Sequence, residues 1–526
     1  MLNARNIQGI IILTLGTILA VWLGLSIATN QVETILQVIM AVVLITCLAL
    51  GRRIWLLIPF TIALDITFRL PGLPSSALLG QILVLAFSLL LFLMRKLPFR
   101  LAWTELEFWI LVMTLFVVQV YLRNPIGVNV FGGDTVGGRP YALFAVALAT
   151  ALLLTGLKVP INDLKMMLRM SIAAGILNVA VSILGTFVPT VGYYTGNSFA
   201  RTDEPNYENI GVAVDERAAT RINWLASFSK NAALWVSSFI SPLKAFVRPL
   251  WCALLILSLA AAAMSGFRNT VFSVILIYTL AIAYRGGLAS LMVSGLMAVG
   301  ALTIITLVNS LAPLPPNIQR SLSFLPGNWE EKQREQSKES SDWRMEIWKE
   351  ALTSERWIRN KWMGDGLGFS AAELAGQMNA RKGVRSGLSG MDAHRETILV
   401  NGDYHSGPVS TIRVIGGIGL LFFLLAQIRL AVHTHRQIMR CRGTEWFPLA
   451  LYIGIPVICA PIMFVFIFGD FKTSGALFLI SCGMIRLLEN NLPLPAYVSR
   501  SRMPYMLSSR QNTSQVAEGF SANRAG

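Results

Sequence analysis

Residues 405–432 read HSGPVSTIRVIGGIGLLFFLLAQIRLAV. The stretch begins with polar and small residues, whereas its last 19 residues, 414–432, are predominantly apolar. A helix of about 20 apolar residues crosses the hydrocarbon core of a bilayer. These residues therefore predict a helix that enters a membrane directly after a polar segment.

That polar segment is residues 312–410, which lie between long apolar runs. It holds 13 of the chain's 28 acidic residues and 13 of its 44 basic residues, so its formal charge is zero. A charge-balanced segment of this length at a membrane surface is expected to fold. We therefore expect the chemistry of the protein to involve this loop.

Repeated apolar runs determine the predicted fold. The chain has 526 residues, 54% of them hydrophobic and 14% charged, with a mean hydropathy of +0.59, whereas soluble domains carry roughly 25% charged residues. The runs predict an all-α polytopic membrane protein with about 14 transmembrane helices and one large, partly helical external loop, which the family resemblance given below implies is periplasmic. The expected spans are residues 9–28, 32–49, 54–69, 76–95, 105–122, 141–157, 165–189, 223–243, 248–265, 268–284, 288–311, 412–433, 447–469 and 472–488.

The formal net charge of +16 indicates membrane topology rather than nucleic-acid binding. The basic excess lies in short loops beside the apolar runs, where the positive-inside rule places cytoplasmic loops. With the N-terminus inside, the cytoplasmic loops are 51–53, 95–100, 244–248, 285 and 435–442. The same count places the loops 123–140, 190–222, 265–268 and 312–410 outside.

The chain is therefore expected to have four parts. These are an N-terminal transmembrane bundle (1–311), the large external loop (312–410), C-terminal transmembrane helices (411–489) and a disordered cytoplasmic tail (490–526). The first apolar run lacks a convincing A-x-A cleavage site, so it is interpreted as a span rather than a removed signal peptide. The five cysteines form no C-x-x-C motif and predict no disulfide.

The large loop has internal order. Leu-Pro-Pro at 314–316 ends the preceding helix. Residues 343–352 predict an amphipathic helix, because Trp343, Ile347, Ala351 and Leu352 fall on one face, at positions i, i+4, i+8 and i+9. The sequence GDGLG at 364–368 predicts a flexible turn, in which Gly364 and Gly366 allow the backbone to approach a ligand closely.

His405 is the first candidate for catalysis. It precedes a span on the expected outer face, and Ser406 and Gly407 follow it. An imidazole near its ordinary pKa accepts a hydroxyl proton at neutral pH, so His405 fits a general base. The alternative is an interfacial histidine that hydrogen-bonds a loop.

Arginines on the same expected face are candidates for phosphate binding, because a guanidinium binds phosphate in a bidentate manner. Arg268 lies in an external tight turn, where orientation needs no positive charge, although it could be an ordinary snorkelling turn arginine.

Arg344 lies on the predicted loop helix, where a surface salt bridge with Glu346 or Glu350 is the alternative. Arg217 and Arg221 share a helical face in the 190–222 loop, and Asp215 and Glu216 could pair with them.

These pieces together resemble a known family. His405-Ser406, nine residues and Gly416-Gly417-Ile418-Gly419 have the form H-[NSQ]-x9-G-x-x-[GTY], which resembles the O-antigen ligase and polymerase superfamily. Residues 265–268 (SGFR) resemble the family's S-G-S-R turn, 344–348 (RMEIW) its R-x-x-x-W helix and 364–368 its G-x-G-x-G turn. The resemblance covers roughly residues 248–435. Ser406 stands where Asn is common and Phe267 replaces a Ser, so acceptor positioning stays open.

The resemblance implies a metal-independent, inverting glycosyltransferase of the bacterial inner (cytoplasmic) membrane. Its donor would be an undecaprenyl-diphosphate-linked glycan at the periplasmic face, and its acceptor a glycan or a lipid. Carried over, Arg268 would bind the diphosphate and stabilise the leaving group, and Arg344 would contact the diphosphate or the sugar. His405 would deprotonate or orient the acceptor hydroxyl, with Ser406 beside it. No cofactor or metal is expected. Membrane lipids and chain-length or export machinery would be the partners.

Cations that neutralise a diphosphate leaving group suit such a transfer. An exopolysaccharide or O-antigen polymerase is placed ahead of a ligase, because the chain is long and departs from the motif. A flippase or exporter of lipid-linked oligosaccharide is the alternative from another class, and Asp65 and Lys230 are its intramembrane charges. A membrane scaffold is the third reading, but it leaves the histidine and arginines unexplained.

Overall fold

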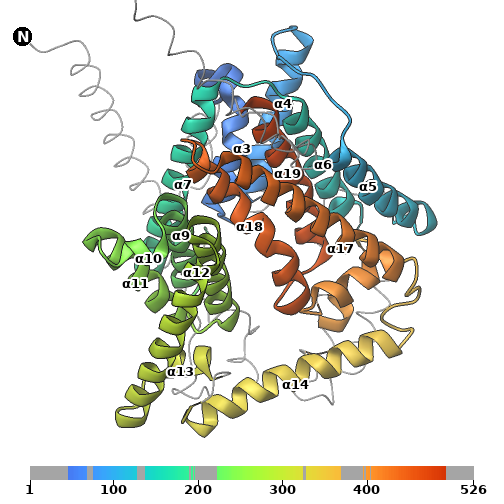
Figure 1. Cartoon of the computed structure of the whole chain (residues 1–526). Helices are drawn as coiled ribbons and strands as arrows, with labels where there is room; N and C mark the ends of the chain where they lie inside the picture. The colour runs from blue at the N-terminus through green and yellow to red at the C-terminus, as the bar shows by residue number, and fades with distance from the viewer. Residues whose placement is uncertain are drawn as a thin grey trace, which may run out of the picture. The chain divides into compact units, whose positions relative to one another are not determined.

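The computed structural model describes most of the chain, and every regular element in that part is a helix (Figure 1). An isolated antiparallel bridge joins Phe99 to Leu157. The described residues are 46–67, 75–126, 137–188, 191–192, 195, 222–323, 327–368, 395, 398–402 and 404–492.

Most helices follow the apolar runs of the sequence, whereas α13 and α14 lie in the polar segment 312–410. They are η1 (Gly51–Leu56), α3 (Leu57–Leu64), α4 (Ser76–Leu93), α5 (Glu105–Arg123), α6 (Arg139–Gly156), α7 (Ile161–Phe187), α9 (Asn223–Phe239), α10 (Pro242–Ala245), α11 (Pro249–Met264), α12 (Arg268–Leu311), α13 (Pro316–Leu322), α14 (Glu331–Thr353), α17 (Gly407–Cys441), α18 (Phe447–Phe466) and α19 (Phe471–Asn491).

Nine helices in the described residues are long and apolar enough to cross a membrane, which indicates a multi-pass membrane protein. The predicted all-α polytopic class is confirmed at this level. The count of about 14 stays a prediction, because the expected span 9–28 and most of 32–49 lie outside the described residues. The expected span 54–69 ends early: Asp65 follows α3 in a left-handed conformation with φ of 43°.

Helix α12 contains two of the expected spans. It breaks at Gly287, where φ is 71°. Before the break, Tyr284 hydrogen-bonds His435 at 2.8 Å, and Arg285 donates to the carbonyl of Ser237. After the second half, Asn317 donates to the carbonyl of Met264, just before α12 begins. The chain therefore turns back at Gly287, and residues 288–311 return toward the start of the first half.

Polar residues at the helix starts explain where several helices begin. Ser75, Ser406 and Asp470 each accept a hydrogen bond from a backbone amide three residues later, at α4, α17 and α19. At α5, Thr104 and Glu107 form a capping box. Such caps satisfy amides that have no partner within the helix.

The apolar core that positions the candidate site lies between α5, α6, α17, α18 and α19. Phe423 is fully buried at its centre and packs edge-on against Phe464, Phe471 and Phe478. Among the described ion pairs, one joins two buried side chains in this core: Arg486 binds Glu107 at 2.9 Å. Removing either partner would leave an uncompensated buried charge and strongly destabilise the protein.

The loops expected to be cytoplasmic gather at one end, which we call the basic end. There Arg53 binds Asp163 at 2.9 Å, and Lys165 binds Glu445 at 2.9 Å. Arg285 lies over the ring of Phe447 at 5.1 Å. The grouping agrees with the predicted topology. The side of a membrane that this end faces stays a prediction from the positive-inside rule.

Helices α6 and α19 are in close contact at Gly483, and a substitution there tests the packing. A Cβ atom at this glycine would lie 2.9 Å from Leu154 Cβ and 3.0 Å from the Ala151 carbonyl oxygen. We expect Gly483→Ala to lower the free energy of unfolding by about 1–3 kcal/mol, because the helices must separate. The measurement is an SDS titration of the purified protein.

Gly300→Ala in α12 is the matched control, because a Cβ atom there meets nothing within 4 Å. This change should leave stability equal or higher. Equal stability of the Gly483 variant would contradict the packing described here.

Candidate functional site

The candidate site is built around the start of α17. Ser406 caps the helix and accepts from the amide of Val409 at 3.5 Å, and Pro408 occupies the first turn. His405 lies immediately before the cap with φ of 51°. A positive φ is uncommon outside glycine and persists where surrounding contacts hold it. The end of the large loop is thus held in one specific geometry.

Two aromatic rings flank His405. The ring of Trp343 on α14 lies 6.1 Å away between centroids, and that of Phe468, which follows α18, lies 5.5 Å away. Trp348, also on α14, donates to the carbonyl of Tyr404 at 2.7 Å. His405 is therefore where the loop helix, α17 and the segment between α18 and α19 meet.

A small apolar cluster, the loop core, attaches α14 to this junction. Its buried members include Ile347 and Ala351 of α14 and Tyr404 and Val409 next to α17. The predicted amphipathic helix at 343–352 is confirmed as the second half of α14. Trp343, Ile347 and Ala351 pack as the spacing predicted, whereas the prediction was wrong for Leu352, which is 37% exposed.

Arg344 lies at the same junction and is half-buried. It follows Trp343 and shares a helical face with Ile347 and Trp348, because residues three and four apart are neighbours on a helix. Glu346 and Glu350, the expected alternative partners of Arg344, both bind Arg395, at 3.0 and 2.8 Å. The structure thus brings Arg344 and His405 to one helix–loop junction.

Arg268 is the first residue of α12, after the turn at residues 265–267. One turn further along, Ser273 donates to the sulfur of Met463 in α18 at 3.6 Å. The segment that follows α18 carries Phe468, which contacts His405. Arg268 thus lies at the end of the helices where His405 lies, and α18 connects the two regions.

The glycines of the predicted ligand turn pack against other parts of the protein, Gly364 against backbone and Gly366 against a side chain. A Cβ atom at Gly364 would lie 2.5 Å from the carbonyl oxygen of Val414, and one at Gly366 would lie 2.8 Å from Tyr141 Oη. Both glycines have positive φ, 81° and 117°. Close packing against α17 and α6 accounts for them without a ligand, and an approach to a ligand stays a prediction.

Three further arginines are candidates for the site: two that the sequence analysis named, and one that it did not. Arg217 and Arg221 lie outside the described residues. Arg413, in the first half of α17, is buried at 4% exposure and donates to the carbonyl of Asn401 at 3.2 Å. An arginine directly ahead of the apolar run is the signal that could have identified it.

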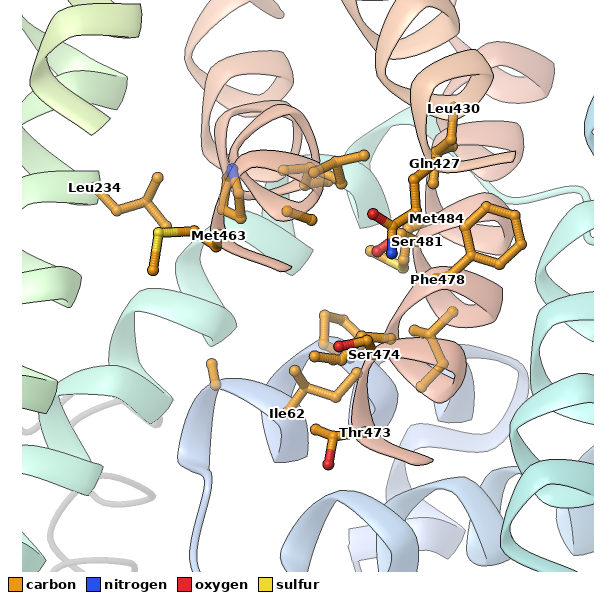
Figure 2. Close-up of a pocket in the computed structure, with 18 of the residues that line it drawn as sticks. Ile62, Leu234, Gln427, Leu430, Met463, Thr473, Ser474, Phe478, Ser481 and Met484 are labelled. Carbon is orange, nitrogen blue, oxygen red and sulfur yellow. The ribbon is translucent and has the colours of Figure 1, made fainter. Parts of the chain in front are cut away.

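A cavity of about 520 Å³ lies next to this junction, between α3, α7, α9, α17, α18 and α19. Figure 2 shows apolar side chains such as Ile62, Leu234 and Phe478 on its wall, and Gln427 and Ser481 add polar atoms. Phe468 is also part of the wall, so one ring contacts both the cavity and His405.

Within the described residues, no group of three or more His, Cys, Asp or Glu could hold a metal ion. The chain matches no protein-family model and no curated protein. Inference about function therefore depends on the chemistry of the residues at the junction.

The position of His405 between two rings can be tested by chemical modification. We expect Phe468→Ala and Trp343→Ala each to raise the rate at which diethyl pyrocarbonate modifies His405, because each removes one covering ring. Site-resolved mass spectrometry of the purified protein measures this rate. The rate at His435, which bonds Tyr284 at the basic end, should stay constant. An unchanged rate at His405 in both variants would show that these rings do not cover it.

Proposed function

We propose that this chain is a membrane glycosyltransferase that transfers or polymerises a glycan carried on undecaprenyl diphosphate. The observation that carries the proposal is the position of His405. It lies between the charged loop helix and the wall of an apolar cavity, through Trp343 on one side and Phe468 on the other. Transfer from a lipid-bound donor to a sugar hydroxyl requires a site where a polar acceptor and an apolar lipid chain can both bind.

The proposed reaction is a direct displacement without a metal. His405 takes the proton of the acceptor hydroxyl, and the oxygen attacks the anomeric carbon of the donor sugar as the bond to the diphosphate oxygen breaks. Configuration at that carbon inverts. Arg268 and Arg344 neutralise the charge that develops on the departing diphosphate. Ser406 fixes the start of α17 beside the base.

The cavity supports a lipid-linked donor. Most of its lining residues are apolar, and its volume lies in the range of about 300–1,000 Å³ typical of ligand sites. A hydrocarbon chain bound there would hold the attached diphosphate near the junction of α14 and α17. The proposed localisation is the bacterial inner membrane with the large loop in the periplasm, consistent with the grouping of basic loops at the other end.

A polymerase and a ligase would use the same site and differ in the acceptor. A polymerase extends a second lipid-linked glycan, whereas a ligase moves finished glycan to a lipid. We place the polymerase first, on the length of the chain and its departures from the family motif. A gel of surface glycans from a knockout strain separates them: short chains indicate a polymerase, and long lipid-linked glycan that accumulates indicates a ligase. An unchanged glycan profile contradicts both.

A flippase or exporter is the alternative, and one observation favours it. Asp65 and Lys230 interact electrostatically, and their neighbours Ala63 and Asn231 line the cavity. A transporter of charged lipids needs charges along its path. Purified protein in vesicles distinguishes the two classes, because an exporter moves lipid-linked glycan across the bilayer without forming a new glycosidic bond.

Replacing the base is the direct test of the transferase. We expect His405→Ala to lower the rate of glycan transfer by about 10²–10⁴-fold, the usual contribution of a general base. The assay uses purified protein in vesicles with a fluorescent lipid-linked glycan. His435→Ala, at the basic end, is the control and should keep transfer near the wild-type rate. Full activity of the His405 variant would remove it as the base.

Chelation tests the absence of a metal step. We expect transfer in the same vesicles to proceed at an unchanged rate after treatment with EDTA, because arginine guanidinium groups neutralise the diphosphate. A loss of activity that added Mg²⁺ restores would contradict the metal-independent reaction.

A further inference from the structure

We propose that Arg123, with Gln119 and Asn124, forms a clamp at the end of α5 that positions His405 through the α17 break. These are positioning residues, since they act on His405 through the backbone of α17. The inference rests on the proposed function, in which His405 is the reacting base. Three steps support it: the break in α17, the turn that fills the break, and the clamp that holds the turn.

The break lies at Gly416, where φ is 80° within α17. In a continuous helix, the amides of Gly417 and Ile418 would donate to the carbonyls of Arg413 and Val414, four residues earlier. Here Gly417 donates to Lys361 at 2.7 Å, and Ile418 donates to the carbonyl of Trp362 at 3.3 Å. Two helical hydrogen bonds are therefore replaced by bonds to residues 361–366, which we call the wedge turn.

The wedge turn also satisfies the carbonyls that the break leaves open. The amide of Asp365 donates to Arg413 O at 2.6 Å, and that of Gly366 donates to Val414 O at 3.1 Å. A Cβ atom at Gly416 would overlap the carbonyl of Trp362, so glycine is required for this contact. The direction of α17 at the break is thus set by where the wedge turn lies.

The wedge turn is fixed by two side chains, that of Asp365 within it and that of Asn360 directly before it. The carboxylate of Asp365 accepts from the amides of Arg359 at 2.8 Å and Asn360 at 3.0 Å. The side-chain oxygen of Asn360 accepts from the amide of Met363 at 2.8 Å. A turn closed by its own polar groups moves as a unit, so its outer contacts decide its position.

Tyr141 of α6 packs against Gly366, and side chains at the end of α5 hold the turn by hydrogen bonds. Arg123 Nη2 donates to the carbonyls of Met363 at 2.8 Å and Gly364 at 2.7 Å. Gln119 donates to Met363 O at 3.1 Å, and Asn124 donates to the carbonyl of Asp365 at 3.1 Å. Arg123 Nε also bonds Gln119 at 3.0 Å, which orients the guanidinium. Three consecutive carbonyls of the wedge turn are therefore held by one helix.

The geometry makes His405 sensitive to the clamp. His405 lies 11 residues before Gly416, a separation of roughly 16 Å at the helical rise of 1.5 Å per residue. A change of about 10° in direction at the break would then move His405 by about 3 Å on this estimate. A misplacement of about 1 Å can lower a rate by about 100-fold. A small movement of the wedge turn would therefore displace His405 far enough to lower the rate of glycan transfer.

The principal variant is Arg123→Ala. Arg123 is exposed and its hydrogen bond to the Met363 carbonyl lies at the surface, so the variant should fold. We expect kcat for glycan transfer to fall roughly 10–100-fold while KM for the donor stays within about threefold, because the base is displaced and the donor site is intact. Hydrogen exchange at the amides of Gly417 and Ile418, which donate to the wedge turn, should become faster. Arg123→Lys should restore part of kcat.

Arg429→Ala is the matched control. Arg429 also joins α17 to α5, through Glu105, and it too is exposed, but it lies beyond the break. We expect kcat and amide exchange at Gly417 and Ile418 to match the wild type. Equal losses in the Arg123 and Arg429 variants would mean that general α5–α17 packing, not the clamp, matters.

Failure of the clamp and failure of the proposed function give different results. Faster exchange with unchanged kcat in Arg123→Ala overturns the clamp, and so does a lower kcat with unchanged exchange. Full activity of His405→Ala instead overturns the role of His405, whatever the exchange rates show.

Discussion

Gly417 and Ile418 donate their backbone hydrogens to the wedge turn rather than to the preceding turn of α17. Within a bilayer, each backbone polar group needs a partner in the protein, because lipid offers none. A helix can therefore break near a membrane only where another segment supplies donors and acceptors in register. The wedge turn does so, and this one exchange ties the large loop to the helical core. The start of α17, and with it His405, depends on that exchange.

His405 is also where two kinds of surface meet. On one side, the loop core joins a helix rich in charge to the end of α17. On the other, Phe468 belongs to the wall of an apolar cavity. The imidazole contacts one surface through the ring of Trp343 and the other through the ring of Phe468, and neither ring buries it completely. Neither surface alone favours a transferase, whereas their common boundary suits a reaction between a polar acceptor and a lipid-bound donor.

Much of the fold could be predicted from hydropathy, because membrane helices need long apolar runs. The two spans within α12, the helix at 343–352 and the grouping of basic loops all follow from local patterns. The role of the wedge turn could not, since Gly364 and Gly416 are 52 positions apart in the sequence and nothing local marks their contact. The glycines at 364 and 366 indicated close approach, but not that the partners were the backbone of α17 and the side chain of Tyr141. Arg123 was hidden for the same reason: it follows an apolar run, as many anchoring arginines do.

The second half of α12, residues 288–311, has a single buried residue, Asn309, and large exposed side chains such as Leu288, Leu296 and Leu311. In a bilayer, lipid would surround it on almost every side, so its tilt would follow the thickness of the hydrocarbon layer. Asn309 holds the carbonyl of Asn328 at 2.6 Å, three residues before α14 begins. Helix α14, whose Trp343 contacts His405, is thus anchored near its start to a helix that lipid would surround, so a change in bilayer thickness would be transmitted to the candidate site.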